Sequence, residues 1–324
     1  MEQKRDYSID MIKFVAVFLI INSHADICYP RYSVLATGGA IGDCLFLFVS
    51  GYTLFLGKMN SFDNYYKRRI NRIYPSVISC WIVTYLLNTL WGIGNVKDIF
   101  GYGFIIAIMI YYILLYFVRK YMVNQMRWVI ICVLLVTAIV YIFWFPYKYE
   151  ISSMGIYGIS TNFRWVPYFG IMLMGALVGS RRESLSFHPK FDAIKMILNL
   201  FLFYGIQLLS KIYVSLAPLQ IITVLFLAGF VFYFYKFCNA KMFEKWYHNR
   251  SGNFMITAIG GLCLESYLIQ FNIITDRWNF IFPLNIPIVM VLVLFAGYIV
   301  RCLASFFSQT FRTEDYEWKK IFLL

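Results

Sequence analysis

One histidine of this sequence falls inside an apolar segment and shares a helix face with a lysine. His24 and Lys13 are eleven residues apart, which on an α-helix is about 20° from eclipsed and about 16 Å along the axis. The other two histidines, His188 and His248, lie in polar stretches. Because imidazole exchanges protons near neutral pH, His24 is a candidate general base. The alternative is a neutral core histidine that is hydrogen-bonded to a neighbour.

Two carboxylates also fall within apolar segments. Glu265 lies near the middle of one segment. A lone ionised carboxylate is costly there, so it must be protonated, paired or facing a wet cavity. Asp43 lies near the start of another segment, at the depth expected for His24. Asp43 either orients the His24 ring or is an aspartate at the aqueous rim, and the sequence favours neither.

Two arginines are spaced to bind an anion. Arg69 and Arg72 are at positions i and i+3, so on a helix their guanidinium groups would share one face. Forked arginine donors suit phosphate oxygens. The headgroups of membrane lipids explain the same pair at least as well as a phosphate ligand does.

Two further residues lie where a ligand could pass. Ser50, followed by Gly51, fits a close helix-packing site better than a nucleophile, although both residues can line a passage for a thin ligand. Arg164 begins another apolar segment. Its guanidinium can contact an acceptor or anchor the segment at the membrane interface.

Membrane-spanning helices are needed to position these residues. The chain is 61% hydrophobic and 14% charged, whereas soluble domains are about 45–50% apolar and about 25% charged. The apolar residues form stretches of roughly twenty, the length that crosses a ~30 Å hydrocarbon layer. We therefore predict an all-α polytopic membrane protein with one transmembrane domain over residues 1–324. The ten predicted spans are residues 8–27, 38–57, 74–93, 99–118, 128–145, 164–180, 193–210, 216–237, 254–274 and 286–307.

Basic residues are distributed unevenly between the two sides of these spans. With the N-terminus in the cytoplasm, 23 of the 29 basic residues fall on the inner side. The positive-inside rule then predicts that both termini are cytoplasmic and that the number of spans is even. The same rule explains the net charge of +13 without a nucleic-acid partner. The six basic residues on the outer side are Arg31, Lys97, Lys148, Arg164, Lys211 and Arg277.

Four motifs occur in order along the chain. They are Asn22–Ser23–His24 with Lys13 eleven positions earlier, Phe46–Tyr52, Arg69 and Arg72 with Tyr74–Pro75, and Leu264–Gln270. Together they resemble the acyltransferase-3 family of integral membrane O-acyltransferases, which modify surface polysaccharides and lipopolysaccharide. The resemblance covers essentially the whole chain, as a membrane core without the hydrolase-like domain of some members. Two positions depart from the family, since Lys13 replaces the usual arginine and Gln270 stands where many members have histidine.

The resemblance implies that the donor is a cytoplasmic acyl-CoA, acetyl-CoA in the simplest case. Its phosphates would bind Arg69, Arg72 and Lys13 at the inner surface, and its pantetheine arm would pass Ser50. His24 would act as the general base or as a covalent acyl carrier, and the sequence does not separate these roles.

The acceptor implied by the resemblance is a hydroxyl of a cell-surface or lipid-linked glycan, reached from the outer side of the cell membrane. The candidates to receive it are Arg164, Asp43, Tyr267 and the loop from Pro146 to Phe163, and of these Asp43 has no matched position in the family. Glu265 is the second catalytic candidate. No metal-ligand spacing, disulfide pattern or nucleotide-binding glycine loop is recognisable, so no metal and no further cofactor are expected.

Two other classes of protein compete with this interpretation. A proton-coupled transporter or flippase of glycan precursors could use His24 and Glu265 as proton relays, and a non-enzymatic membrane scaffold is a third class. The arginine pair, together with Lys13 and His24 on one helix face, favours an enzyme, because proton-coupled transport does not require a phosphate clamp on the inner side.

Overall fold

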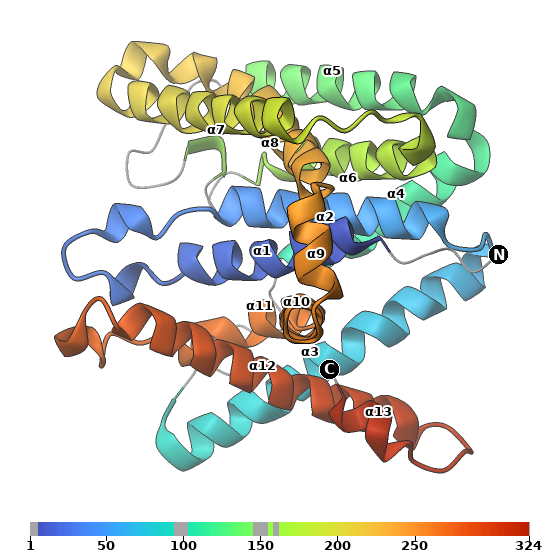
Figure 1. The fold of residues 1–324 in the computed structure, drawn as a ribbon, viewed down its shortest axis with the longest axis vertical. Coiled ribbons are helices and arrows are strands. Elements are labelled where there is room, and N and C mark those ends of the chain that lie inside the picture. Colours follow the sequence, from blue (N-terminus) through green and yellow to red (C-terminus); the bar gives the residue numbers. More distant parts are fainter. Residues whose placement is uncertain (1–5, 94–102, 145–154, 158–161, 324) are drawn as a thin grey trace. The chain divides into compact units, whose positions relative to one another are not determined.

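A computed structural model describes residues 6–93, 103–144, 155–157 and 162–323 of the chain. These residues form α-helices joined by short 3-10 helices and loops, and they contain no β-strand (Figure 1). The predicted all-α fold is therefore confirmed. Seven helices are long and apolar enough to cross a membrane, or eight if the bent pair Arg250–Gly261 and Cys263–Ile273 is one span. The count of ten spans and the cytoplasmic termini stay predictions.

Each of the ten predicted segments contains a helix. The helices are α1 (Tyr7–Ser23), α2 (Gly39–Leu56), α3 (Phe62–Trp91), α4 (Gly103–Tyr121), α5 (Met126–Trp144), α6 (Trp165–Ser180), α7 (Pro189–Ile212), α8 (Thr223–Cys238), α9 (Lys241–His248), α10 (Arg250–Gly261), α11 (Cys263–Ile273), α12 (Asn285–Thr310) and α13 (Trp318–Phe322). The helices α9 and α13 lie outside the predicted segments. Both are short and contain lysines, so a search for apolar stretches misses them.

The helix that differs most from its predicted segment is α3. It begins at Phe62 instead of residue 74 and runs for 30 residues, so the arginine pair lies on the helix itself. Its first turns are rich in polar residues, which is why they do not appear as part of an apolar span. Pro75 lies inside the helix and cannot donate a backbone hydrogen bond to the carbonyl four residues earlier.

The predicted segment 254–274 is two helices and not one. The helices α10 and α11 are bent by 67° at a break that follows Gly260 and Gly261. Arg301 of α12 donates from Nη1 to the carbonyl oxygen of Gly261 at 2.6 Å. A cation therefore caps the carboxyl end of α10, where the helix dipole favours positive charge.

The helices group into two compact units. Unit 1 comprises Met1–Ile12, Asp43–Lys58 and Ile113–Tyr247, and unit 2 comprises Lys13–Gly42, Met59–Tyr112 and His248–Leu324. The helices α1, α2 and α4 contribute residues to both units, and the boundary after Tyr247 leaves the last residue of α9 in unit 2. The single domain over residues 1–324 stays a prediction.

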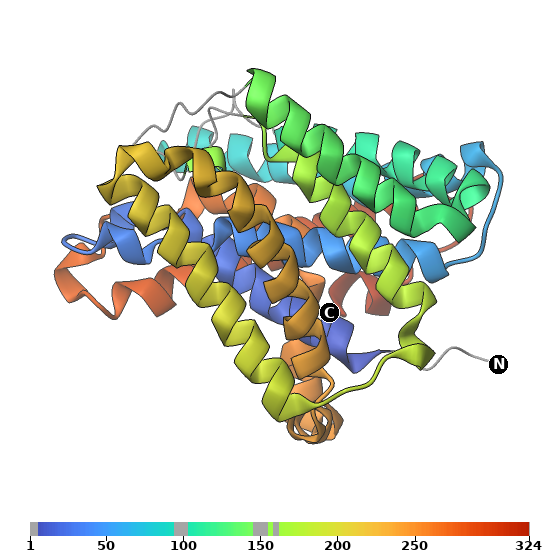
Figure 2. The same cartoon turned by 90° about the horizontal axis from the view of Figure 1, so that it is seen from above.

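In unit 1, α7 and α8 form an antiparallel pair that lies side by side in both views (Figures 1 and 2). Lys236 of α8 donates from Nζ to Oδ1 of Asp192 in α7 at 2.7 Å, and both side chains are buried. Asp192 also accepts from the backbone N–H of His188 at 2.7 Å. One carboxylate therefore binds both Lys236 and the backbone at the start of α7.

The crossing of α2 and α6, also in unit 1, depends on glycine. A Cβ at Gly51 would lie 1.8 Å from the carbonyl oxygen of Met172, and a Cβ at Gly175 would lie 2.0 Å from that of Phe48. Backbones that approach so closely leave no room for a side chain at these two positions. The structure thus supports the prediction that Ser50 and Gly51 belong to a close helix-packing site.

In unit 2, α3, α11 and α12 pack on one another. A Cβ at Gly297 of α12 would come within 2.9 Å of the Ser266 hydroxyl oxygen in α11, so these two helices are in close contact. On the side of α3, Asn272 Nδ2 of α11 donates to Thr84 Oγ1 at 3.0 Å. The short helix α11 is therefore held by both neighbours.

Candidate functional site

The predicted site residues divide between the two units. Unit 1 contains Asp43, Ser50 and Arg164, and unit 2 contains Lys13, His24, Arg69, Arg72, Glu265 and Tyr267. The candidate base, the arginine pair and the buried glutamate are thus brought into one compact unit from distant parts of the sequence. The predicted proximity of Asp43 to His24 stays a prediction.

His24 lies directly after the last residue of α1, whereas the predicted segment continued to residue 27. Its backbone N–H donates to the carbonyl of Ile21 at 3.2 Å, which adds a final tight turn. The half-buried ring is edge-on to Phe271 of α11, with the centroids 4.6 Å apart. The imidazole therefore contacts the helix that carries Glu265, and it lies at the carbonyl end of α1, where a positive charge is stabilised.

Asn22 explains why α1 ends where it does. Its Nδ2 donates to the carbonyl oxygens of Leu35 at 2.7 Å and Thr37 at 3.0 Å. Its Oδ1 accepts from the Tyr29 hydroxyl at 2.6 Å. The amide therefore holds the loop that returns to α2, and the loop in turn fixes the chain beside His24.

Glu265 is buried in the first turn of α11, with 7% of its surface exposed. Its Oε1 accepts a hydrogen bond from the Ser76 hydroxyl of α3 at 2.8 Å. Glu265 therefore has a polar partner inside the protein. The positive charges of Arg301 and Arg72 also act on the carboxylate. The amino end of α11 adds the favourable end of a helix dipole.

The arginine pair lies on the polar part of α3. Arg69 is half-buried, and its guanidinium carbon lies 5.5 Å from the centre of the Tyr65 ring. The buried Nε of Arg69 has no hydrogen-bond partner among the described residues. Arg72 is exposed, and its charge reaches Glu265. Whether the pair binds phosphate stays a prediction.

Tyr267 and Lys13 are the two remaining candidates of unit 2. Tyr267, two residues after Glu265 on α11, lies against Phe104 of α4 with the ring centroids 4.9 Å apart. Lys13 is half-buried on α1. Binding of substrate by Tyr267 and of donor by Lys13 stay predictions.

The substrate-binding candidates of unit 1, Arg164 and Asp43, interact electrostatically with each other. Arg164 donates from Nη1 to the carbonyl oxygen of Tyr157 at 2.9 Å, and its guanidinium stacks over the Trp165 ring at 4.7 Å. Its charge also acts on the Asp43 carboxylate. Ser50 is half-buried at the α2–α6 crossing. Of the loop Pro146–Phe163, residues 146–154 and 158–161 lie outside the described residues.

Three contact residues were not among the sequence-based candidates. Ser76 directly follows the motif that ends at Pro75, and only the approach of α11 gives it a partner. Phe271 is one of many phenylalanines, so nothing in the sequence marks it. Arg301 does carry a signal in the sequence, because it is a cation inside the apolar segment 286–307.

The cysteines of the described residues are all free. Among the same residues, no group of three or more histidine, cysteine, aspartate or glutamate side chains could hold a metal ion.

Comparison with curated proteins gives no match, and neither does comparison with solved structures. Comparison with protein-family models gives one that covers nearly the whole chain. This model is described as an acyltransferase domain and matches residues 6–308. The chain therefore belongs to the acyltransferase-3 family.

Proposed function

We propose that this protein transfers an acyl group, acetyl in the simplest case, from cytoplasmic acyl-CoA to a hydroxyl of a cell-surface or lipid-linked glycan. The observation that carries the proposal is a chain of contacts inside unit 2. The helix α3 bears the arginine pair and holds Glu265 through Ser76. From Glu265, α11 runs about 9 Å along its axis to Phe271, which contacts His24.

The donor would bind first to the polar part of α3. The Nε of Arg69 is a buried donor that no described residue bonds, and Arg72 is exposed one helical turn further on. Both guanidinium groups could donate charge-assisted hydrogen bonds to phosphate oxygens, and such bonds are about twice as strong as neutral ones. Lys13 would line the path of the pantetheine arm towards His24, and Ser50 is a separate candidate for contact with the arm.

At the thioester, His24 would remove the proton of the acceptor hydroxyl as its oxygen attacks the carbonyl carbon. The new C–O bond forms, the C–S bond breaks, and the thiolate of CoA takes the proton back from the imidazolium. The carbonyl end of α1 favours this imidazolium, and general-base catalysis contributes typically 10²–10⁴-fold. In the alternative route, His24 first takes the acyl group itself and then passes it to the acceptor.

Glu265 would act on the donor side of the reaction. Its side chain accepts a hydrogen bond from Ser76, and the charges of Arg301 and Arg72 act on it, so a carboxylate here would favour a guanidinium close to the donor while the donor binds. The acceptor would approach from the outer side of the membrane, and the candidates for contact with it are Arg164 and Asp43 in unit 1 and, separately, Tyr267 in unit 2. This arrangement requires the ten-span topology with cytoplasmic termini, in the cell membrane, that the charge distribution predicts.

The test is incubation of the purified protein in lipid nanodiscs with labelled acetyl-CoA and glycan acceptors. We expect release of free CoA together with label on the glycan, and loss of both in His24→Ala. Rapid acid quenching would separate the routes, because only a covalent route leaves label on the protein. Movement of a glycan precursor across the bilayer without release of CoA would instead favour a flippase.

A further inference from the structure

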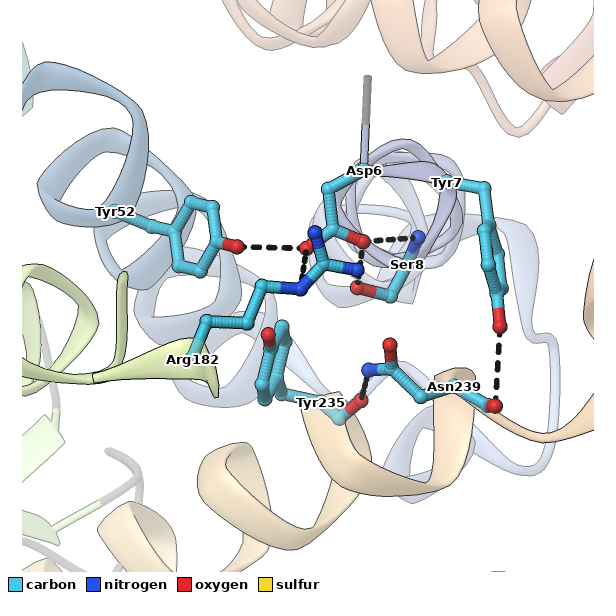
Figure 3. Close-up of polar contacts among 7 residues, drawn as sticks. All are labelled: Asp6, Tyr7, Ser8, Tyr52, Arg182, Tyr235 and Asn239. Carbon is cyan, nitrogen blue, oxygen red and sulfur yellow. Dashed lines mark hydrogen bonds and ion pairs between the residues drawn. The ribbon is translucent and has the colours of Figure 1, made fainter. Parts of the chain in front are cut away.

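A polar cluster in unit 1 surrounds the start of α1 and has no part in the proposed chemistry. We call it the α1 clasp, and Figure 3 shows its members converging from four elements. They are Asp6, Tyr7 and Ser8 at the start of α1, Tyr52 of α2, Arg182 after α6, and Tyr235 and Asn239 at the end of α8.

Asp6 is the centre of the α1 clasp. Its Oδ1 accepts from the backbone N–H and the hydroxyl of Ser8, at 3.1 and 2.6 Å, which is the pattern of a helix N-cap. Its Oδ2 accepts from the Tyr52 hydroxyl at 2.7 Å and forms an ion pair with Arg182 Nε at 3.2 Å. Only 7% of the Asp6 side chain is exposed. A cap needs one oxygen, so the second oxygen serves the contacts with α2 and Arg182.

The neighbouring residues tie α1 to α8 and α9. The Tyr7 hydroxyl donates to the carbonyl oxygen of Asn239 at 3.0 Å, and Asn239 itself donates from Nδ2 to the carbonyl oxygen of Tyr235 at 2.8 Å. One turn further along α1, Asp10 accepts from the Tyr247 hydroxyl of α9 at 3.1 Å. The first turn of α1 is therefore fixed by directional contacts to several elements.

The middle of α1 cannot fix its own register in this way. Residues 14–21 are apolar without exception, and apolar surfaces tolerate small shifts because dispersion and burial are not directional. Polar contacts act at the two ends, the α1 clasp at the start and Asn22 at the finish. The Asp6–Arg182 pair is only partly buried, with 38% of the arginine side chain exposed. Such an ionic contact adds little net stability but can specify one register.

We propose that Asp6 and Arg182 are positioning residues for the transfer reaction, because they set the height and rotation of α1 and so the places of Lys13 and His24. A shift of one residue moves a helix by 1.5 Å and turns it by about 100°. The inference rests on the proposed acyl transfer. A 1 Å misplacement of reacting groups can cost about 10²-fold in rate, so the effect on turnover would exceed the effect on stability.

Two substitutions of Asp6 separate positioning from capping. Asp6→Asn keeps a side chain that caps a helix as well as aspartate does but carries no charge for Arg182. Asp6→Glu keeps the charge, and glutamate is not a preferred cap. We expect kcat for acetyl transfer to fall about 10- to 100-fold in Asp6→Asn and to fall less in Asp6→Glu. The melting temperature should be higher in Asp6→Asn than in Asp6→Glu, because only asparagine keeps the cap.

Arg182→Gln removes the partner without touching the cap. It should lower kcat as Asp6→Asn does, and the double variant should be no slower than either single variant, since both remove one contact. The matched control is Asp192→Asn, which breaks the buried pair with Lys236 in the same unit. It should lower the melting temperature and leave kcat per folded molecule unchanged.

A second readout does not require turnover. The rate of maleimide labelling at Lys13→Cys, corrected for the native cysteines, should change when Asp6→Asn is added. If the wild-type protein transfers no acyl group, the proposed function is wrong while this labelling still tests the clasp. If the wild type is active but Asp6→Asn and Arg182→Gln keep its kcat and its labelling rate, or if kcat simply follows the melting temperature in all variants, the α1 clasp has no positioning role.

Discussion

Removing the hydroxyl of Ser76 should release the Glu265 carboxylate that it holds. The two residues are 189 positions apart in the sequence and are joined by a hydrogen bond of 2.8 Å between buried atoms. Ser76→Ala leaves the charge of Glu265 in place but takes away its side-chain donor. A buried acceptor that loses its partner bears the desolvation cost without the compensating bond.

The size of the effect follows from the charge on the acceptor. Hydrogen bonds to charged groups contribute about 1.5–3 kcal/mol, which corresponds to roughly 10- to 150-fold in an equilibrium constant at 1.4 kcal/mol per tenfold. Glu265→Gln keeps an oxygen that accepts from Ser76, at the roughly 0.5–1.5 kcal/mol of a neutral bond. Ser76→Ala should therefore destabilise the fold more than Glu265→Gln does.

Acyl transfer should be impaired more by Glu265→Gln than by Ser76→Ala. Glu265→Gln abolishes the charge that interacts with Arg72 and Arg301, whereas Ser76→Ala only loosens it. We therefore expect Glu265→Gln to remain folded and to lose most of its acyl transfer, and Ser76→Ala to retain more transfer per folded molecule.

The assay is thermal unfolding in nanodiscs combined with the rate of CoA release from acetyl-CoA. Ser79→Ala is the matched control, because Ser79 is also buried on α3 and the substitution removes one hydroxyl without touching the Ser76–Glu265 bond. A Ser76→Ala protein with the melting temperature of the wild type would refute the view that this bond holds the carboxylate. A fully active Glu265→Gln protein would remove Glu265 from the mechanism.

Further predictions concern the base, the clamp, the helix crossing and the topology. His24→Ala and His24→Asn should fold and bind CoA but lose transfer by about 10²–10⁴-fold; near-normal rates of glycan acylation would make His24 a core histidine. Arg69→Ala and Arg72→Ala should each weaken CoA binding by about 1.5–3 kcal/mol, measured by calorimetry, and lysine should restore only part of this; unchanged binding in both would leave the pair as lipid-facing charge. Gly51→Ala should lower the melting temperature strongly, because its Cβ would lie 1.8 Å from a carbonyl oxygen, whereas Gly205→Ala, with no atom within 4 Å of the added Cβ, should not. Cysteine-accessibility labelling should place the C-terminus in the cytoplasm, and an external C-terminus would overturn the two-sided mechanism.

The sequence alone was sufficient for the helical class and for the position of most helices. Hydrophobicity and its extent along the chain are local properties, so the segment 38–57 could be matched to α2 (Gly39–Leu56) without knowledge of its neighbours. The same locality marked His24 and Glu265, because an ionisable residue is conspicuous inside an apolar run. The family could also be inferred from short motifs, and the family model over residues 6–308 confirms it.

Only the tertiary structure decided which of these residues meet. Apolar helices can pack on one another in many ways of similar energy, since burial is not directional, and the sequence does not say which faces come together. The bonds of Ser76 to Glu265 and of Arg301 to Gly261 exist because α3 and α12 pack beside the broken pair α10–α11. The contact of His24 with Phe271 and that of Asp6 with Arg182 likewise join residues that are distant in the chain. A local pattern carries no information on such pairs, because each depends on the placement of whole helices.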